Sequence, residues 1–499
     1  MTHCRHHSLL AVFALMLCAC GVSDKTAQSS SSTTEPPTGS ASVTSIDVVP
    51  QADATPEAIP DIVLHGGSIF IADEASTVVE AIAIKDGTVL AVGSSEEMIE
   101  LAGPSTTTVD LEQRSVLPGF IDPHTHLSQV PAPDLEAMAS AHEQMVARGI
   151  TTVGIPSVEP EHLDAYRELE ASEQLLVRTH LYPVYNTVCG GYEHDDFHLD
   201  HQFDRDPNLG LAIAGVKIYT DGGVCNAPAV SFEYPDSVPQ GLKESGWVGR
   251  GSLYVSPDEI AAVVAQIDDA GGITVIHGIG DVGLRTALEG LEIADTASPL
   301  SQPHRIDHNS MASLLDDDEL SLYGQLDIIP VVQMMPWASG CEEGRSELWA
   351  TILPAPAYSS VEDRSAIAEQ NPGIRFAWHS DNPWVPGSPL QHLFSATTRG
   401  AITDDGSDVC FPEAWDWFPT VEVDEAIKMT TINAAAAMGI DQHVGSLEVG
   451  KAADLVVLSN NIFDTDPKVA LAFNRSEITM ISGTTVFCDS PLCDDLFGG

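Results

Sequence analysis

Eight short apolar runs recur through the middle of the chain and alternate with segments of helical pattern. Runs such as ITVIHGIGD at 273–281 have the length and β-branched content of buried strands, whereas PDEIAAVVAQIDDAGG at 257–272 repeats apolar residues at helical spacing. Eight strand–helix units are what a parallel barrel requires. The sequence therefore predicts an α/β fold with a (β/α)8 TIM-like barrel over residues 118–440. The eight runs cover residues 119–126, 150–158, 175–185, 211–223, 273–281, 304–310, 326–336 and 374–384.

Strand patterns on both sides of the predicted barrel indicate a second, smaller unit. Residues 61–117 have the pattern of short strands and turns, and Asp86-Gly87 between alternating apolar positions is a strong hairpin signal. Similar patterns return within residues 441–499. We therefore expect both chain ends to build one β domain, a small β-sandwich beside the barrel.

The first twenty residues, MTHCRHHSLLAVFALMLCAC, place Arg5 ahead of an apolar run that is too short to span a bilayer. This pattern predicts a signal peptide over residues 1–20. Its end resembles a bacterial lipoprotein box, which predicts a lipid on Cys20 and anchoring to the bacterial cell envelope, at the outer membrane or facing the periplasm. Ordinary secretion with cleavage nearby is the alternative. The Ser, Thr and Pro-rich segment 21–60 is expected to be a flexible tether.

The charge of the chain limits its classes of partner. It carries 73 acidic and 21 basic residues, a formal net charge of -52, so the phosphates of nucleic acid would be repelled. We expect a small-molecule substrate, no nucleic-acid partner, and contact with a membrane only through the lipid anchor; a homo-oligomer is compatible with the sequence.

The cysteines after Cys20 are even in number, which permits disulfides in an exported protein. The turn-like DSPL segment could let Cys488 pair with Cys493.

Residues that can bind metals or transfer protons fall at the ends of the predicted strands. His124 and His126 end the first run, and because side chains alternate along a strand, both should project to one side. An isolated His-x-His pair is as often an ordinary histidine pair as a metal site. Further groups reach the same rim, where a parallel barrel carries its chemistry. These groups are Lys217, His277, His308 and Asp381.

With these motifs the chain resembles the amidohydrolase superfamily, and within it amidohydrolase family 3, also described as YtcJ-like metal-dependent hydrolases. The resemblance covers about residues 61–488 and rests on LPGFIDPHTH, GVKIYTDGG, VIHGIGD, RIDHNSM, HSDNP and INAAAAMGIDQHVGSLEVGKAADLVVL. It implies a barrel that holds one or two divalent metals, most often zinc, with a bound water as the nucleophile.

The resemblance also implies a role for each candidate residue. His124 and His126 match the first metal pair, and Asp381 matches the aspartate that contacts the metal and takes the proton from the attacking water. Lys217 matches a carboxylated lysine that bridges two metals; a substrate-binding or structural ammonium is the alternative.

The ligands of the second metal are implied in the same way. His277 and His308 match them, and His304 competes with His308 because both share a strand face, although His304 lies deeper in the barrel. We favour His308.

Other residues near the rim are candidates for the substrate pocket. His379 departs from the family pattern, in which the residue two before Asp381 is often small. It is expected either to line the pocket or to orient Asp381, with a packed core histidine as the alternative. Trp384 and Trp337 are candidates for an apolar pocket wall, with core packing as the alternative. Three further histidines lie among acids in a predicted loop or lid and match no metal template: His194, His198 and His201.

The motifs together predict an exported, lipid-anchored, metal-dependent amidohydrolase. We expect it to use a metal-activated water to cleave a linear or cyclic C–N bond of amide type, other than a peptide bond, in a small molecule. Hydrolysis of esters or other carbonyl compounds at the same site is one alternative. A surface binding lipoprotein without turnover is another, but none of the six expected ligand positions has been lost.

Overall fold

The structure is a computed structural model of the 499-residue chain. The residues that it describes are 59–126, 133–192, 195–334, 341, 351–354, 357, 361–385, 387–403, 407–413, 416, 418–464 and 466–497. Several predictions concern residues outside these ranges: the signal peptide, most of the tether, Cys20, His194 and Trp337.

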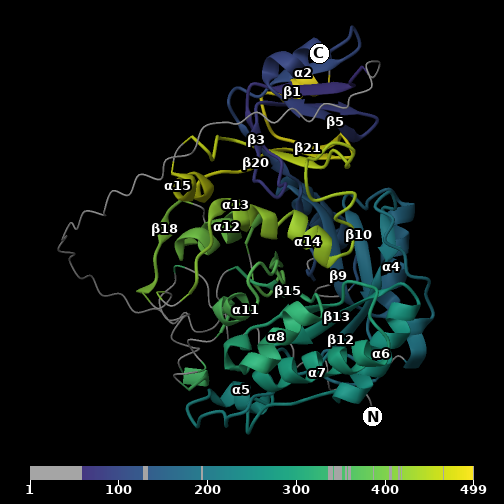
Figure 1. The fold of residues 1–499 in the computed structure, drawn as a ribbon, viewed down its shortest axis with the longest axis vertical. Helices are drawn as coiled ribbons and strands as arrows, with labels where there is room; N and C mark the ends of the chain where they lie inside the picture. The colour runs from purple at the N-terminus through teal and green to yellow at the C-terminus, as the bar shows by residue number, and fades with distance from the viewer. Residues whose placement is uncertain are drawn as a thin grey trace, which may run out of the picture.

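Strands from both chain ends form the small domain, at the top of Figure 1, where purple and yellow segments lie together. One sheet has the order β5-β4-β1-β6, with β1 Ile62–His65, β4 Ala81–Lys85, β5 Thr88–Gly93 and β6 Thr107–Asp110. The other has the order β21-β20-β19-β7-β2-β3. Its strands are β2 Ser68–Phe70, β3 Val78–Val79, β7 Ser115–Pro118, β19 Leu455–Leu458, β20 Ser476–Ile481 and β21 Thr484–Cys488.

The predicted hairpin at Asp86-Gly87 is confirmed. β4 and β5 pair antiparallel, and the two turn residues have φ of 48° and 77°, the left-handed backbone that a two-residue turn requires. One hydrophobic cluster includes Ile82 of the first sheet and Val457 of the second. A β domain from both chain ends is therefore present, while its classification as a sandwich and the domain boundaries stay predictions.

All eight predicted runs form strands, and these pair in parallel. β8 to β10 with the short β11 (Leu211–Ile213) form one sheet, and β12 to β16 form another. An isolated bridge between Val184 and Lys217 connects the two. The strands are β8 Phe120–Asp122, β9 Ile150–Val158, β10 Arg178–Pro183, β12 Gly215–Tyr219, β13 Ile273–Gly278, β14 Arg305–His308, β15 Ile329–Val332 and β16 Ala377–Trp378.

The strands follow the order of a TIM-type barrel without forming one continuous closed sheet. In the part of the chain that the structure describes, no ladder pairs β16 with β8. Instead, two backbone hydrogen bonds join the segments just beyond these strands. Asp381 N donates to His124 O at 3.0 Å, and His126 N donates to Asn382 O at 2.7 Å. The first and last strands thus deliver their ends to one place.

Helices pack against the outer faces of the strands. Ile276 and Ile306 share a hydrophobic cluster with Val264 of α6 and Leu284 of α7. Helix α6 starts with a capping box between Ser256 and Glu259. The helices along this part of the chain are α3 Leu135–Ala147, α4 Pro160–Ala171, η1 Asp195–Leu199, α5 Gln240–Glu244, α6 Pro257–Asp269, α7 Asp281–Ala297, η2 Ala312–Leu314, α8 Asp317–Gln325, α11 Ser365–Gln370, α12 Pro389–Thr398, α13 Val423–Met429 and α14 Ile432–Ala437. The remaining elements are α2 Ser95–Glu100, β17 Ala401–Ile402, β18 Val409–Cys410, α15 Pro467–Ala472 and α16 Cys493–Phe497.

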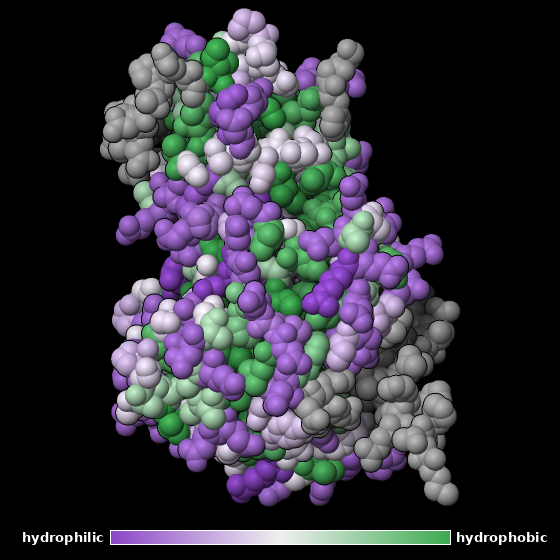
Figure 2. Space-filling model, turned by 90° about the vertical axis from the view of Figure 1, so that its right-hand side faces the viewer, coloured by the Kyte–Doolittle hydropathy of each residue, from purple (hydrophilic) through white to green (hydrophobic). Residues whose placement is uncertain are grey.

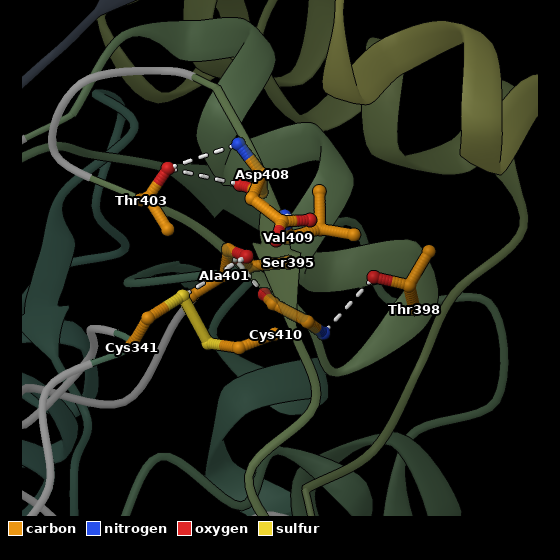
Figure 3. Close-up of a disulfide and its surroundings, with 9 residues drawn as sticks. Cys341, Ser395, Thr398, Ala401, Thr403, Asp408, Val409 and Cys410 are labelled. Atoms are coloured by element: carbon orange, nitrogen blue, oxygen red, sulfur yellow. Dashed lines mark hydrogen bonds between the residues drawn. A yellow bond between two sulfur atoms is a disulfide. The ribbon is translucent and has the colours of Figure 1, made fainter. Parts of the chain in front are cut away.

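The described part of the chain contains three disulfides, two of which join separate segments. Cys488 and Cys493, whose pairing the sequence permits, form one of them. Figure 3 shows a second bridge, from Cys341 to Cys410 of β18, with Cys341 Sγ also 3.6 Å from Ala401 O. The third joins Cys189 to Cys225, in the segments after β10 and β12. These bridges fit an oxidising environment.

The surface is mixed in polarity. Figure 2 shows hydrophilic residues spread over the described part of one face, with hydrophobic residues between them. Among the residues described, no helix has both the length and the apolar character needed to cross a membrane.

Candidate metal centre

Two of the predicted histidines and the predicted aspartate meet at one point. The Nε2 atoms of His124 and His126 are 3.2 Å apart. Asp381 Oδ1 lies 3.4 Å from the Nε2 of His124 and 3.6 Å from that of His126. Within the described ranges, no other three His, Cys, Asp or Glu residues bring their ligand atoms within 4.8 Å of one another. The two imidazoles lie on one side as expected, but β8 ends at Asp122, so both histidines lie just beyond the strand and not within it.

Three more imidazoles surround this group. The ring centroid of His308 lies 5.0 Å from that of His124 and 4.5 Å from that of His277. His379 stacks on His124 at 4.8 Å with an interplanar angle of 29°, and its ring lies 4.9 Å from His308. All four side chains are buried. The histidines predicted at four strand ends are therefore gathered in one cluster.

A backbone turn brings His308 into the cluster. In the parallel register Asp307 is level with His277, so both project into the interior, and strict alternation would send His308 outward. His308 instead has a φ of 76° and Asn309 a φ of 57°. The chain therefore leaves the strand direction at this residue, and the imidazole turns inward.

His304, the competitor of His308, lies elsewhere. Its Nδ1 is 2.8 Å from Thr274 Oγ1, and its Nε2 is 3.0 Å from a carboxylate oxygen of Asp268, on the outer helix α6. Both ring nitrogens are thus engaged away from the cluster, which supports the choice of His308.

Lys217 is fully buried on β12, level with Val275 of the next strand. In the described part of the chain its Nζ has no hydrogen-bond partner, and it lies 5.0 Å from the centroid of the Tyr219 ring. Burial lowers the pKa of Lys217 to about 8. A buried amine in this state can lose its proton and take up carbon dioxide, so the residue fits the expected carbamate.

Sequence reasoning missed the support behind His124. Its Nδ1 donates to Asp307 Oδ2 at 2.6 Å, and Arg305 Nε donates to Asp307 Oδ1 at 3.0 Å. Arg305 also donates to Pro123 O at 2.6 Å, so it contacts both the residue before His124 and the carboxylate that binds the His124 ring. This chain of bonds sets the ring so that Nε2 faces His126. The oppositely charged residues Arg305 and Asp307, two apart within a predicted buried strand, were the signal available.

Two further polar groups hold Asp381 and its strand in place. Asp122 accepts hydrogen bonds from Ser380 Oγ at 2.5 Å and Ser380 N at 3.1 Å, which ties β8 to the segment after β16. Gln333, just beyond β15, donates from Nε2 to Asp381 Oδ2 at 3.4 Å. The segment that carries Asp381 is therefore tied to the end of β8, and the carboxylate itself is contacted from the end of β15.

His277 is oriented by the loop after β12. Its Nε2 lies 3.2 Å from Gly222 O and 3.5 Å from Asp221 Oδ1. Asp221 in turn accepts the main-chain N–H groups of Gly280 at 2.8 Å and Ala229 at 3.0 Å. Because Nε2 is engaged there, Nδ1 is the nitrogen of His277 that remains for a metal.

The electrostatics of the cluster suit a divalent cation. Burial lowers the pKa of His277 and His379 to about 3 and holds the pKa of His124 and His308 well below its ordinary value. Neutral imidazoles are what metal ligation requires. Burial raises the pKa of Asp381 well above its ordinary range, and a carboxyl in this position gains most from a nearby positive charge. The donor set of imidazoles, a carboxylate and an orphaned amine fits a zinc-type metal.

The candidates for the substrate pocket are only partly placed. Trp384 is half-buried in the turn after Asp381, and its main-chain N donates to Asp381 O at 2.8 Å. In the predicted loop or lid, His198 packs edge-on against Tyr185 and His201 against Phe197. A pocket role for His379 and Trp384 stays a prediction.

Comparison with known proteins places the chain in a family. The profile described as "Amidohydrolase family" matches residues 128–487, well over half of the chain. The chain belongs to the amidohydrolase family. This membership confirms the resemblance inferred from the sequence motifs and the prediction of an amidohydrolase.

The similar proteins are only distantly related to this amidohydrolase. It is 25% identical over 348 residues to "Protein LONG AFTER FAR-RED 3" of Arabidopsis thaliana, covering 66% of this chain and 53% of that one. Identity to the "N-substituted formamide deformylase" of Arthrobacter pascens is 24% over 338 residues, covering 66% and 56%. The chain thus spans about half the length of these two relatives. An "Imidazolonepropionase" of Symbiobacterium thermophilum is 24% identical over 396 residues, covering 76% and 83%.

Solved structures share the fold of the amidohydrolase. An uncharacterized metal-dependent hydrolase from Pyrococcus horikoshii superposes with a TM-score of 0.63 at 18% identity, covering 82% of this chain and 99% of that one. An adenosine deaminase from Xanthomonas campestris with bound zinc gives 0.57 at 14% identity, covering 88% and 96%. At these identities the likeness shows an α/β fold of the TIM-barrel type.

Proposed function

We propose that this amidohydrolase is a metal-dependent hydrolase that cleaves a C–N bond of amide type, linear or cyclic and not a peptide bond, in a small molecule. The observation that carries the proposal is the convergence of His124, His126 and Asp381 within 4.8 Å at the strand ends. When bound there, a divalent metal would polarise a water and the carbonyl of the substrate. His277, His308 and Lys217 would hold a second ion.

The residues of the chain would then divide the work. Asp381 Oδ1, within 3.6 Å of both imidazoles, is placed to take a proton from the attacking water and to give it to the departing nitrogen. His124 is kept in one orientation by Asp307, so its Nε2 stays directed at the same point as that of His126. Burial of the cluster strengthens the electrostatic interactions within it.

The names of the relatives support the reaction class. An N-substituted formamide deformylase and an imidazolonepropionase are named for linear and cyclic C–N substrates. Hydrolysis of esters at the same site and surface binding without turnover are the two competing functions.

The experiment that tests the proposed function is metal analysis of the purified protein combined with a hydrolysis screen over formamides, amides, cyclic amides and esters. Turnover of esters alone would indicate an esterase. A metal-loaded protein without any turnover would indicate a surface binding protein.

Lys217→Ala should lower the metal content from about two ions per chain to about one, because the bridging anion is lost. Metal content by mass spectrometry checks this, and a 44 Da increase in the mass of the intact folded wild-type protein, absent from Lys217→Ala, would identify the carbamate. Lys243→Ala is the matched control, because Lys243 lies on α5 and its ammonium donates to Asp236 O in the wild type. Full metal content and full activity in Lys217→Ala would remove the lysine from the site.

We also propose that the protein is exported and anchored by a lipid on Cys20. Three disulfides in the described residues support an oxidising compartment. Cys20→Ser should abolish lipidation and release the protein from the membrane fraction, as should globomycin treatment. An unmodified N-terminus downstream of Cys20, found by mass spectrometry of the wild-type mature protein, would contradict the anchor.

A further inference from the structure

Glu362 is a buried acid beside the candidate metal centre that none of the roles above uses. Its exposed fraction is 4%. Its main-chain N–H donates to Ser310 O at 2.8 Å, and Ser310 Oγ donates to Glu362 Oε1 at 2.7 Å. Ser310 lies two residues beyond His308, so this reciprocal pair of hydrogen bonds fixes the acid at the carboxyl end of β14.

Gln333 lies between Glu362 and Asp381. Its Nε2 donates to Asp381 Oδ2 at 3.4 Å. Burial and the nearby charge of Asp381 raise the pKa of Glu362 to about 8. Ser310 and the main-chain N–H of Gln333 lower this pKa, but by less. The two acids are therefore neighbours on the rim where the predicted chemistry takes place.

Only one of the two carboxyl oxygens of Glu362 accepts a hydrogen bond from a described residue. Oε2 is buried and meets no donor at hydrogen-bonding geometry in the described part of the chain. Arg364, two residues further on, does not form an ion pair with it: the guanidinium donates to Pro419 O at 2.6 Å and lies over the Phe418 ring at 5.4 Å. Burial disfavours the charged form of this carboxyl, and a ligand that supplies both a donor and a positive charge would favour it, so such a ligand would be bound selectively.

Resting on the proposed function, we infer that Glu362 is a specificity-determining residue that recognises a protonated nitrogen of the substrate. Its Oε2 would accept a hydrogen bond from an ammonium or amidinium group carried a few bonds from the scissile C–N bond. The net charge of -52 favours the same class of ligand, because it concentrates cations near the surface. The substrate is then a small amide that carries a basic nitrogen.

The test compares two formamides of equal length, N-(5-aminopentyl)formamide and N-hexylformamide. Their binding to zinc-loaded Asp381→Asn protein is measured by calorimetry, because that variant should not consume them. We expect the charged formamide to bind about tenfold to a hundredfold more tightly, the range for a hydrogen bond between charged groups. Adding Glu362→Gln should remove this preference, since glutamine keeps an acceptor for Ser310 but carries no charge. Glu292→Gln on the surface of α7 removes one charge elsewhere and should leave the preference intact.

Equal binding of the two formamides, binding of neither, or a preference that survives Glu362→Gln would overturn the inference. If the glutamine variant does not fold, Glu362→Asp replaces it: the charge is kept but withdrawn by one methylene, and an undiminished preference would again overturn the inference. Failure of the proposed function gives a different result, namely a wild-type protein that binds metal and prefers the charged formamide but hydrolyses no amide or formamide.

Discussion

Asp381→Asn should lower turnover by on the order of a hundredfold to ten-thousandfold, the usual contribution of a positioned acid–base group. Asp381 Oδ1 lies close to the Nε2 atoms of both His124 and His126, where the attacking water would be held. Asparagine has nearly the same shape but cannot accept the proton. Because the imidazoles should provide most of the affinity, the variant should keep much of its metal, and its thermal stability should change little.

The measurement is turnover against metal content, on a substrate identified by the screen. His379→Ala is the neighbouring comparison, because His379 stacks on His124 and its two ring nitrogens have no hydrogen-bond partner in the described residues. Near-normal turnover in Asp381→Asn together with a collapse in His379→Ala would transfer the proton-accepting role to the histidine.

Asp307→Asn should weaken metal binding by about tenfold to a hundredfold, the usual effect of removing the partner that orients a ligating histidine. It should also destabilise the fold by about 3–5 kcal/mol, because the buried guanidinium of Arg305 loses its countercharge. Arg305 is fully buried, and its Nε lies 3.0 Å from Asp307 Oδ1. Chelator competition would measure the affinity, and urea unfolding would measure the stability.

Asp268→Asn is a matched control for Asp307→Asn. It removes a carboxylate from another histidine, His304, at a similar distance of 3.0 Å, but on the outer side of the strands. It should leave metal affinity unchanged. An equal loss of metal in both variants would mean that Asp307 acts through general stability and not through His124.

Much of the fold could be predicted from the sequence because its signals are local. Each of the eight apolar runs became a strand, since period and β-branched content reflect the burial of a single segment. The Asp86-Gly87 hairpin and the Cys488–Cys493 bridge span only a few residues, so the chain geometry leaves few alternatives. Likewise, the kinds of residue at the ends of the strands, histidines and an aspartate, indicated a metal centre before any contact was known.

The tertiary structure decided the contacts between distant segments. Strand alternation predicts that Asp307 or His308 faces the interior, but not both; the left-handed backbone at His308 allows both. The pairing of Arg305 and Asp307 behind His124, the position of Gln333 beside Asp381, and the burial of Glu362 against Ser310 each join residues from different strand ends. Such contacts depend on the register between strands and on the turns that follow them, and both are set by packing of the whole domain rather than by any one segment.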